Sequence, residues 1–402
     1  MPRMLAPTGS PITVSEVRHW MSALASGRDP RPAFADAVCR HFSVSHCQLF
    51  STGRAAMSFL FSCLTEMNQD TARTEIVVPG YTCYSVASSA LMAGLHVRVC
   101  DIDPDTLSYD MEQLRSIDFS RVLAVTSANL YGLPDNLPEI DAVTREHGVF
   151  LVDDAAQSMQ ARIAGRYSGT WGTAGLFSLD KGKNITSIQG GMIVTDNQPL
   201  ADIMQRRYAL LAENGWTDNV KEYIKLLVYF MFLRPSLYWI PASLPFLHLG
   251  ETRYEDDYPI NRLPRTLAAV STQQLARIDT ITTHRQRNGE CYRQALENVE
   301  GLGRFSVIEG AEPVYLRYPV RVMDAQARQQ FLDSQAVLGV TASYPQSISD
   351  VEEIRSLISI QNDQTPHARQ IAREIVTLPT HAYVDPQDIQ DISTELVRVA
   401  QG

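Results

Sequence analysis

Residues 121–154, RVLAVTSANLYGLPDNLPEIDAVTREHGVFLVDD, carry the pattern that decides the fold. The apolar runs 121–128 and 149–154 predict buried strands, and 137–148 between them predicts a helix that ends at Gly148. A strand, a helix and a second strand at this spacing join parallel neighbours in one sheet. We therefore expect an α/β protein whose mostly parallel sheet is covered by helices on both faces.

The same alternation extends in both directions from this stretch. The segment 84–94 predicts another helix, and apolar runs predict further strands at 75–80, 96–103 and 191–196. The pattern changes near residue 263, where 265–299 predicts one long helical stretch, followed by a smaller α+β segment. At 402 residues the chain is long enough for two domains, so we expect a large domain in 1–262 and a small C-terminal domain in 263–402.

Composition places the chain among ordinary globular enzymes. Apolar residues make up 45% and charged residues 20%, and the net charge of −10 includes no long basic run, which argues against a nucleic-acid partner. The six cysteines form no CxxC pair, so neither a disulfide framework nor a zinc site is indicated, and no spaced His/Cys/Asp cluster predicts a metal. The first residues lack an apolar signal core, which predicts a cytoplasmic location.

An unusually apolar and aromatic segment spans 223–249. Its longest unbroken apolar run, 226–233, is far shorter than the roughly 20 residues that a membrane-spanning helix needs. We interpret the segment as part of an insertion at about 205–255 that is buried or faces a second subunit. The alternatives are a lid over an apolar substrate and a peripheral contact with a membrane, which flanking Tyr, Trp and Arg residues would suit.

Polar side chains stand at the end of the predicted strand 149–154, and strand ends of this kind are where α/β proteins bind their ligands. Asp153 and Asp154 end the strand 149–154, and Gln157 follows shortly after. A carboxylate at such a buried strand end costs desolvation energy unless it meets a cation. This pair therefore predicts a partner with a positive charge, although an Asp at a strand end can also cap a helix.

Two further segments complete a candidate coenzyme site. The stretch 49–64 turns at Thr52 and Gly53 and then predicts a helix, an arrangement that suits phosphate at the helix N-terminus. The polar loop in 177–197 carries Ser178, Lys181 and Lys183 before a Gly-Gly pair. A phosphate cradle, a carboxylate and a lysine together are what pyridoxal 5′-phosphate (PLP) requires, whereas each feature by itself is common.

The ordered set STGRAA (51–56), NLYGLPDNLPEID (129–141), VDDAAQS (152–158) and FSLDKGKNITSIQGGMIVTD (177–196) resembles the DegT/DnrJ/EryC1/StrS family. The resemblance runs from about residue 45 to 300 and continues more weakly beyond. These are PLP-dependent enzymes of the aspartate-aminotransferase-like fold type I, mostly sugar aminotransferases. The resemblance implies that fold, PLP, an amino-acid donor such as glutamate and a keto acceptor on a nucleotide-linked sugar.

The resemblance also implies roles for individual residues. Lys183, which precedes an asparagine as in the family's loop, matches the lysine that binds the coenzyme, whereas Lys181 falls on a variable position. Asp154 matches the acid that pairs with the pyridine nitrogen, and Gln157 the residue beside the ring oxygen. The phosphate is assigned to Ser178 and to the turn Thr52, Gly53 and Arg54. Asn261 matches an asparagine that reaches the phosphate of the neighbouring subunit, which implies a homodimer with shared sites.

The chain departs from the family pattern in two places. Cys83 occupies the position where the family stacks an aromatic side chain on the coenzyme ring, with Tyr81 and Tyr84 beside it. Either the thiol packs on the ring or a tyrosine replaces it. The insertion at 205–255 is longer and more apolar than in the family, which bears on the identity of the acceptor.

Other functions remain open from the sequence. A sugar dehydratase of the same family would carry histidine in place of Lys183. An aminotransferase for a non-sugar or lipid-linked acceptor would account for the apolar segment. A non-catalytic regulatory protein on this fold would not need Lys183, Asp154, Gln157 and Ser178 together. Tyr344 and His381 fit either a substrate cleft or a packed C-terminal domain.

Overall fold

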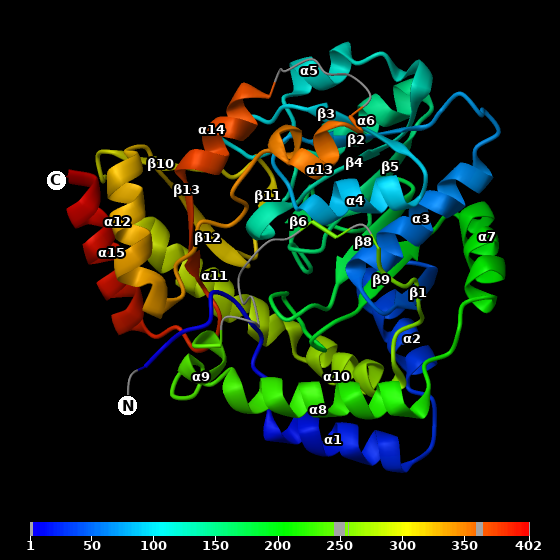
Figure 1. The fold of residues 1–402 in the computed structure, drawn as a ribbon, viewed down its shortest axis with the longest axis horizontal. Helices are drawn as coiled ribbons and strands as arrows, with labels where there is room; N and C mark the ends of the chain where they lie inside the picture. The colour runs from blue at the N-terminus through cyan, green and yellow to red at the C-terminus, as the bar shows by residue number, and fades with distance from the viewer. Residues whose placement is uncertain (1–2, 245–253, 256, 359–364, 402) are drawn as a thin grey trace.

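The computed structural model describes residues 3–244, 254–255, 257–358 and 365–401. In this part of the chain a seven-stranded sheet has the order β1-β9-β8-β5-β4-β2-β3 (Figure 1). Its strands are β1 (His46–Phe50), β2 (Glu75–Pro79), β3 (His96–Cys100), β4 (Val122–Thr126), β5 (Phe150–Asp154), β8 (Ala174–Ser178) and β9 (Gly191–Thr195).

The sheet is mostly parallel, as the sequence predicts. Strands β3, β2, β4, β5 and β8 run parallel to one another, for example with Val152 of β5 opposite Ala174 of β8. Strand β9 is antiparallel to both β8 and β1. The carboxyl ends of β5 and β8 therefore lie side by side, which brings Asp154 close to Ser178.

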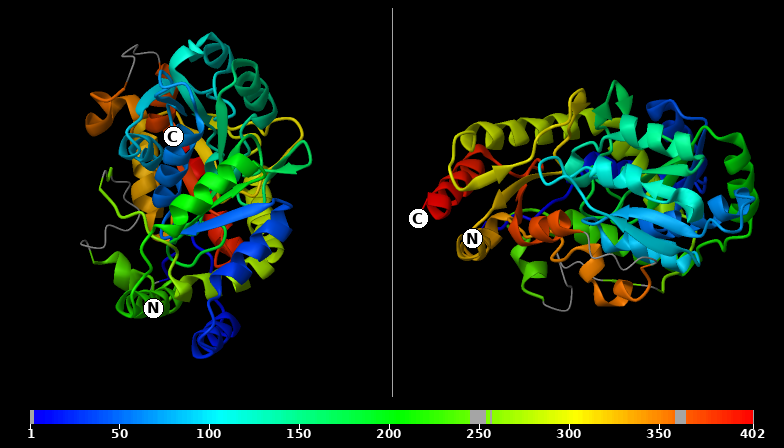
Figure 2. Two further views of the ribbon diagram at one scale, coloured as in Figure 1. Left: turned by 90° about the vertical axis from the view of Figure 1, so that its right-hand side faces the viewer. Right: turned by 90° about the horizontal axis from the view of Figure 1, so that it is seen from above.

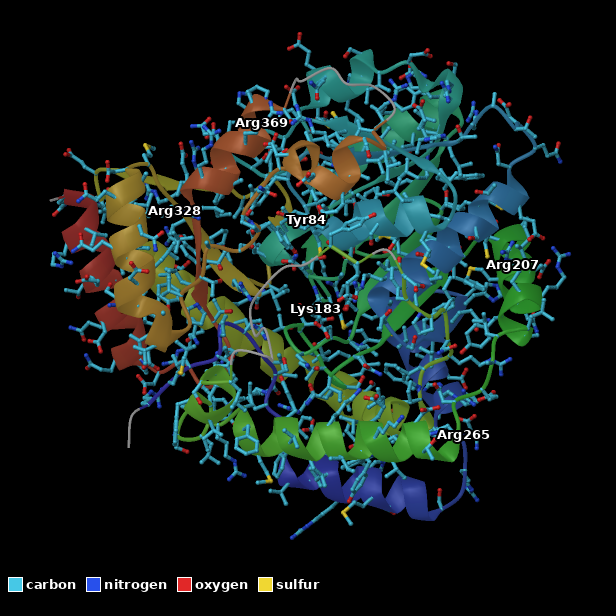
Figure 3. The ribbon with its side chains drawn as sticks, in the orientation of Figure 1. Tyr84, Lys183, Arg207, Arg265, Arg328 and Arg369 are labelled. Carbon is cyan, nitrogen blue, oxygen red and sulfur yellow. The ribbon has the colours of Figure 1, made fainter. Side chains whose placement is uncertain are left out.

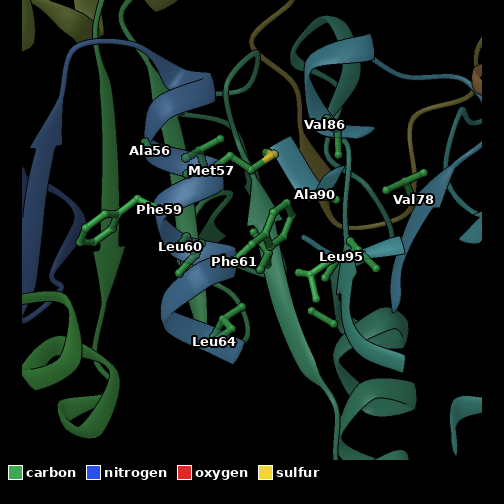
Figure 4. Packing of buried hydrophobic residues seen from close by; sticks show 14 of the residues in the cluster. Ala56, Met57, Phe59, Leu60, Phe61, Leu64, Val78, Val86, Ala90 and Leu95 are labelled. Carbon is green, nitrogen blue, oxygen red and sulfur yellow. The ribbon is translucent and has the colours of Figure 1, made fainter. Parts of the chain in front are cut away.

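Helices cover both faces of this sheet. Helices α3 (Gly53–Met67), α4 (Tyr84–Met92) and α7 (Gln198–Ala209) pack one face with a continuous apolar core, part of which Figure 4 shows around Phe61 and Leu64. On the other side, α5 (Met111–Ser116) and α6 (Leu137–His147) share one core. A further core joins α1 (Val14–Ala25), α2 (Arg31–Phe42), α8 (Trp216–Phe232) and α10 (Arg265–Ala276).

The C-terminal part forms a second layered unit. A three-stranded sheet of β10 (Leu302–Arg304), β12 (Arg317–Val322) and β13 (Ile375–Pro379) packs against α11 (Ile278–Ala295), α12 (Ala325–Gln335) and α15 (Pro386–Gln401). Helices α13 (Glu352–Arg355) and α14 (Pro366–Glu374) connect it to the large sheet. A small sheet joins β11 (Ala311–Glu312) to β6 (Arg162–Ile163) and β7 (Arg166–Tyr167). Both termini lie at the end of the molecule that carries α12 and α15 (Figure 2).

The prediction of one long helix over 265–299 is wrong. The structure has two helices, α10 and α11, and Arg277 between them has the non-helical angles φ −117° and ψ 18°. The Arg277 guanidinium pairs with Glu16 of α1 and also donates to the Pro11 carbonyl. This tertiary contact fixes the residue at which the helix breaks, and helical periodicity contains no trace of it.

The apolar segment begins within α8 and continues into α9 (Trp239–Ala242), whereas its end, 245–249, lies outside the described residues. Leu226 and Leu233 are buried, and the ring of Tyr223 packs on Trp20 of α1 at 4.4 Å. Ile224, Val228 and Met231 are about half exposed along the opposite side of α8. Among the helices that the structure describes, none is long and apolar enough to cross a bilayer.

Candidate active site

A cavity of about 500 Å³ opens where β5 and β8 end and α3 begins. This volume suits a small organic ligand or cofactor. Lys183 lies near the middle of the molecule, between the large sheet and the C-terminal unit (Figure 3). The sequence-predicted residues that line the cavity are Thr52, Gly53, Arg54, Cys83, Asp154, Gln157, Ser178 and Lys183.

The start of α3 forms one wall of the cavity. The Thr52 hydroxyl accepts the Ala55 N–H at 3.0 Å and thereby caps the helix, which leaves neighbouring N–H groups directed to the cavity side. A Cβ atom added to Gly53 would lie 3.3 Å from the Ser178 hydroxyl, so this hydroxyl faces the helix start. A Cβ added to Gly191 would lie 2.5 Å from the Thr52 carbonyl. The absence of side chains at both glycines shapes an anion cradle at a helix N-terminus.

Arg54 stands at the rim of this cradle. Its guanidinium pairs with Glu255 at 2.6 Å and lies over the ring of Tyr258, 5.2 Å from the ring centre. The Tyr258 hydroxyl in turn bonds to Ser58 of α3 at 2.7 Å. The segment after the apolar insertion is therefore tied to the cradle, and Glu255 itself lines the cavity.

The two aspartates at the end of β5 have different environments. The carboxylate of Asp153 is fully buried and accepts hydrogen bonds from Ser127, Asn129, Gly169 and Trp171. Asp154 accepts the Ala156 N–H at 2.9 Å through one oxygen, and its other oxygen bonds to none of the described residues. Burial raises the pKa of Asp154 to about 6, against the opposing effects of the Ala156 hydrogen bond and the Lys183 charge. Asp154 thus offers a desolvated, half-paired carboxylate to a cationic ligand.

The geometry separates the two lysines of the polar loop. Lys181 is exposed, whereas Lys183 is half-buried, lines the cavity and has an amino group that bonds to none of the described residues. The loop is held from outside the large sheet. Ser10 donates to the Lys183 carbonyl at 3.1 Å, and Tyr229 of α8 donates to the Lys181 carbonyl at 3.0 Å. The N-terminal segment and the apolar helix together fix the lysine loop.

Gln157 is oriented by a strained turn. Its Oε1 accepts the N–H of Tyr131, whose φ of 57° lies in the left-handed region that side chains disfavour. The Tyr131 hydroxyl bonds to Ser343 at 2.6 Å, which holds the strained residue in place. The Gln157 amide donates to the Tyr344 hydroxyl at 2.6 Å. Tyr344 therefore adjoins the cavity, whereas His381 is packed in the C-terminal unit against Ala6.

Cys83, rather than a tyrosine, faces the cavity. Its sulfur lies 2.9 Å from the Ser85 hydroxyl, and both residues line the cavity wall. Tyr81 is fully buried, and its hydroxyl bonds to Tyr131 at 3.2 Å. Tyr84 is also buried, and neither tyrosine lines the cavity. This geometry favours the thiol over either tyrosine as the group beside a bound ring.

Asn261 does not line the cavity of its own chain. Its backbone carbonyl accepts the Ser51 N–H at 2.9 Å, immediately before the cradle. Sequence reasoning missed several residues that line the cavity, namely Met57, Ser85, Ser89, Asn129, Asp180, Gln189 and Glu255. Asn129 had a signal, because it follows a predicted strand just as Asp154 does.

The residues present fit PLP. The α3 cradle and Ser178 match a phosphate, the free oxygen of Asp154 matches a protonated ring nitrogen, and the unbonded amine of Lys183 matches an aldehyde. Gln157 also lines the cavity and suits the ring oxygen, and Cys83 suits a contact with the face of the ring. The cavity therefore has a group for each end of this coenzyme.

Comparison with known proteins shows the family of the chain. Residues 20–397 match the sequence profile of the DegT/DnrJ/EryC1/StrS aminotransferase family. GDP-perosamine synthase of Caulobacter vibrioides is 26% identical over 331 residues, which are 81% of this chain and 79% of that protein. GDP-4-keto-6-deoxy-D-mannose 3-dehydratase of Yersinia pseudotuberculosis is 29% identical over 185 residues, so the match spans 46% of either chain.

Solved structures confirm the fold. PseC of Helicobacter pylori, an aminotransferase involved in the biosynthesis of pseudoaminic acid, superposes with a TM-score of 0.80. The alignment covers 99% of this chain and 100% of that one at 16% identity. This likeness confirms the predicted α/β fold of the aspartate-aminotransferase type.

Proposed function

This chain belongs to the DegT/DnrJ/EryC1/StrS aminotransferase family, and we propose that it is a PLP-dependent aminotransferase acting on a nucleotide-linked keto-sugar. The amino donor is an amino acid, for which glutamate is the first candidate. One observation carries the proposal: the amine of Lys183 and the half-paired carboxylate of Asp154 share one cavity with a helix-N-terminal anion cradle.

The roles of the residues follow from their positions. Bound PLP supplies an electron sink for the bonds at the donor's α-carbon. Lys183 would hold the coenzyme at its aldehyde, and the Lys183 amine would accept the proton that leaves the α-carbon of the donor. Asp154 holds the proton on the ring nitrogen, so that the ring stays cationic. Ser178 and the N–H groups that follow Thr52 bind the phosphate.

We propose in addition that two subunits share each site. Asn261 stays out of the cavity of its own chain, while its backbone is tied to Ser51 next to the cradle. An asparagine in this place is free to reach the phosphate of a partner. We assign the half-exposed side of α8 to the subunit contact. The alternative, that this side contacts a membrane, is tested by sedimentation of the protein with lipid vesicles.

An absorbance spectrum tests the function directly. We expect the purified protein to show the band of lysine-bound coenzyme and to lose it when L-glutamate is added. Restoration of the band by a nucleotide-linked keto-sugar, but not by simple ketones, identifies the acceptor class. A protein with no band even after addition of PLP contradicts the proposal.

The same assay separates aminotransferase from dehydratase. The relative of Yersinia pseudotuberculosis makes dehydration the second candidate. A dehydratase releases a deoxygenated keto-sugar and leaves no nitrogen on the product. Mass analysis of the sugar after one turnover with ¹⁵N-glutamate decides between the two, because an aminotransferase product carries the label.

A further inference from the structure

The carbonyl groups of the loop that carries Lys183 are held by side chains from outside the loop. Among the described residues, no backbone N–H donates to the carbonyls of the four consecutive residues 181–184. The donors are instead hydroxyl groups, namely that of Tyr229 for residue 181, that of Thr8 for residue 182, and that of Ser10 for residues 183 and 184. The conformation of this part of the loop therefore depends on groups that the loop itself does not contain.

A strained residue in the same loop supports this dependence. Ile188, five residues after Lys183, has a φ of 71°, in the left-handed region that β-branched residues disfavour. Its N–H donates to the Thr186 hydroxyl at 2.8 Å, and the Thr186 N–H donates to the buried side chain of Gln274 in α10. Backbone strain of this kind persists only where the surrounding structure fixes it. Contacts with other elements therefore maintain the conformation of the loop.

The N-terminal arm, which we define as residues 3–11, connects the lysine loop to the C-terminal unit. Arg285 of α11 donates to the Gly9 carbonyl at 2.8 Å. His381 donates to the Ala6 carbonyl, also at 2.8 Å, and both side chains are fully buried or nearly so. The arm is therefore held by the C-terminal unit on one side, and its hydroxyl groups reach the lysine loop on the other.

Two residues of the arm contact the loop. Ser10 is fully buried, and its hydroxyl accepts Nη2 of Arg285 at 3.3 Å while it donates to the loop carbonyls. The Thr8 hydroxyl donates to the Gly182 carbonyl at 3.0 Å. A Cβ added to Gly182 would lie 2.7 Å from the Thr8 methyl carbon, so the arm and the loop are in close contact. Neither Thr8 nor Ser10 lines the cavity, so each can act on it only through the loop.

We propose that Thr8 and Ser10 are positioning residues for Lys183, which place its amine in the cavity by holding the backbone carbonyls of the loop. The inference rests on the proposed function, in which this amine accepts a proton from the α-carbon of the donor. Proton transfer requires the two atoms to be within hydrogen-bond reach, so a small displacement of the loop slows this step. The arm contacts neither the phosphate cradle nor the rest of the cavity wall, so affinity for glutamate should be preserved.

Thr8 allows a nearly isosteric test in the PLP-loaded enzyme. T8V removes the hydroxyl and T8S keeps it. In T8V we expect the rate at which saturating L-glutamate removes the coenzyme band to fall about tenfold, with the glutamate concentration for half-maximal rate within about twofold of wild type. T8S should react at the wild-type rate. A T8V rate within twofold of wild type, or an equal loss of rate in T8S, overturns the proposal.

Thr195 supplies the matched control, because T195V deletes the same group elsewhere. The Thr195 hydroxyl donates to the Thr173 carbonyl at 2.7 Å. Thr195 ends β9, the strand that follows the lysine loop, and so lies at the end of β9 away from the cavity. T195V should lower the melting temperature and leave the glutamate kinetics unchanged. A T195V rate reduced as much as that of T8V would indicate a general effect of lost stability and would contradict the assignment.

Amide hydrogen exchange in the full-length protein gives a readout that is independent of turnover. In S10A we expect the peptides that cover 179–188 to exchange about tenfold faster than in wild type, because two carbonyls lose their donor. The same peptides should exchange at the wild-type rate in T195V. If they exchange alike in S10A and wild type, this inference fails and the proposed function stands. If the wild-type coenzyme band responds to no amino acid, the donor assignment and this inference fail together.

Discussion

Asp153 and Asp154 are consecutive residues at the end of β5. Both carboxylate oxygens of Asp153 accept hydrogen bonds, whereas one oxygen of Asp154 bonds to none of the residues that the structure describes. Side chains alternate across a strand, so neighbours point to opposite sides. Asp153 therefore anchors the loops around β5, whereas Asp154 is available to a ligand. The pair separates a structural role from a functional one within a single dipeptide.

Asparagine substitutions should divide these roles. We expect D153N to lose about 3 kcal/mol of stability, because the NH2 group of the asparagine cannot accept the hydrogen bonds that backbone N–H groups now donate to the carboxylate. D154N should keep its melting temperature but slow the glutamate half-reaction at least about 100-fold, since Asn cannot hold a ring proton. Thermal melts and stopped-flow absorbance measure the two effects. Equal behaviour of the two variants contradicts the division.

The lysine loop allows a paired test of the coenzyme anchor. We expect K183A to lose the coenzyme band and all turnover, because its amine is the one that lines the cavity. K181A should retain both, because Lys181 is exposed and contributes its carbonyl, not its side chain, to the contact with Tyr229. Spectra of the two PLP-treated proteins decide the matter. A normal band in K183A sinks the assignment.

Gly191 tests the phosphate cradle without altering a ligand-binding side chain. A Cβ there would come within 2.5 Å of the Thr52 carbonyl, so G191A must displace the start of α3. We expect the dissociation constant of PLP, measured by fluorescence titration, to rise about tenfold or more. G94A is the control. Gly94 has a φ of 78° and open space around it, so we expect G94A to lower the free energy of unfolding and to leave the dissociation constant of PLP unchanged.

Tyr229 should link the apolar helix to catalysis. Its hydroxyl donates to the Lys181 carbonyl at 3.0 Å, and Y229F removes this bond at little change in volume. We expect about 1 kcal/mol less stability and a slower half-reaction, because the loop that carries Lys183 loses one of its anchors. Y223F is the matched substitution on the same helix, where the ring packs on Trp20. A half-reaction of wild-type rate in Y229F would show that the loop holds its position without α8.

His381 should govern part of the acid stability. Its Nε2 donates to the Ala6 carbonyl, its Nδ1 accepts the Tyr383 N–H, and burial lowers its pKa from 6.5 to about 4. The unfolded chain therefore binds a proton more readily than the fold. This contribution to stability is complete above pH 6.5 and is lost as pH falls toward 4, by roughly 3 kcal/mol. Melting curves across this range should fall less steeply for H381Q than for wild type.

Local patterns predicted a large share of the fold. The expected strands at 75–80, 149–154 and 191–196 agree with β2, β5 and β9 to within a residue or so at each end. These boundaries were predictable because apolar periodicity and a helix-ending glycine depend only on residues that are close together in the sequence. Where the end of an element depended on a distant partner, as at Arg277 with Glu16, periodicity predicted the wrong boundary.

The sequence by itself determined the fold class, the family, and the candidates Lys183, Asp154, Gln157 and Ser178, since these depend on residue types in a fixed order. The tertiary structure decided which groups are free to react. Asp154 is half-paired among the described residues, and Cys83 faces the cavity, because of how segments far apart in the chain pack together. Such contacts follow from packing in three dimensions, and packing leaves no periodic mark on the sequence.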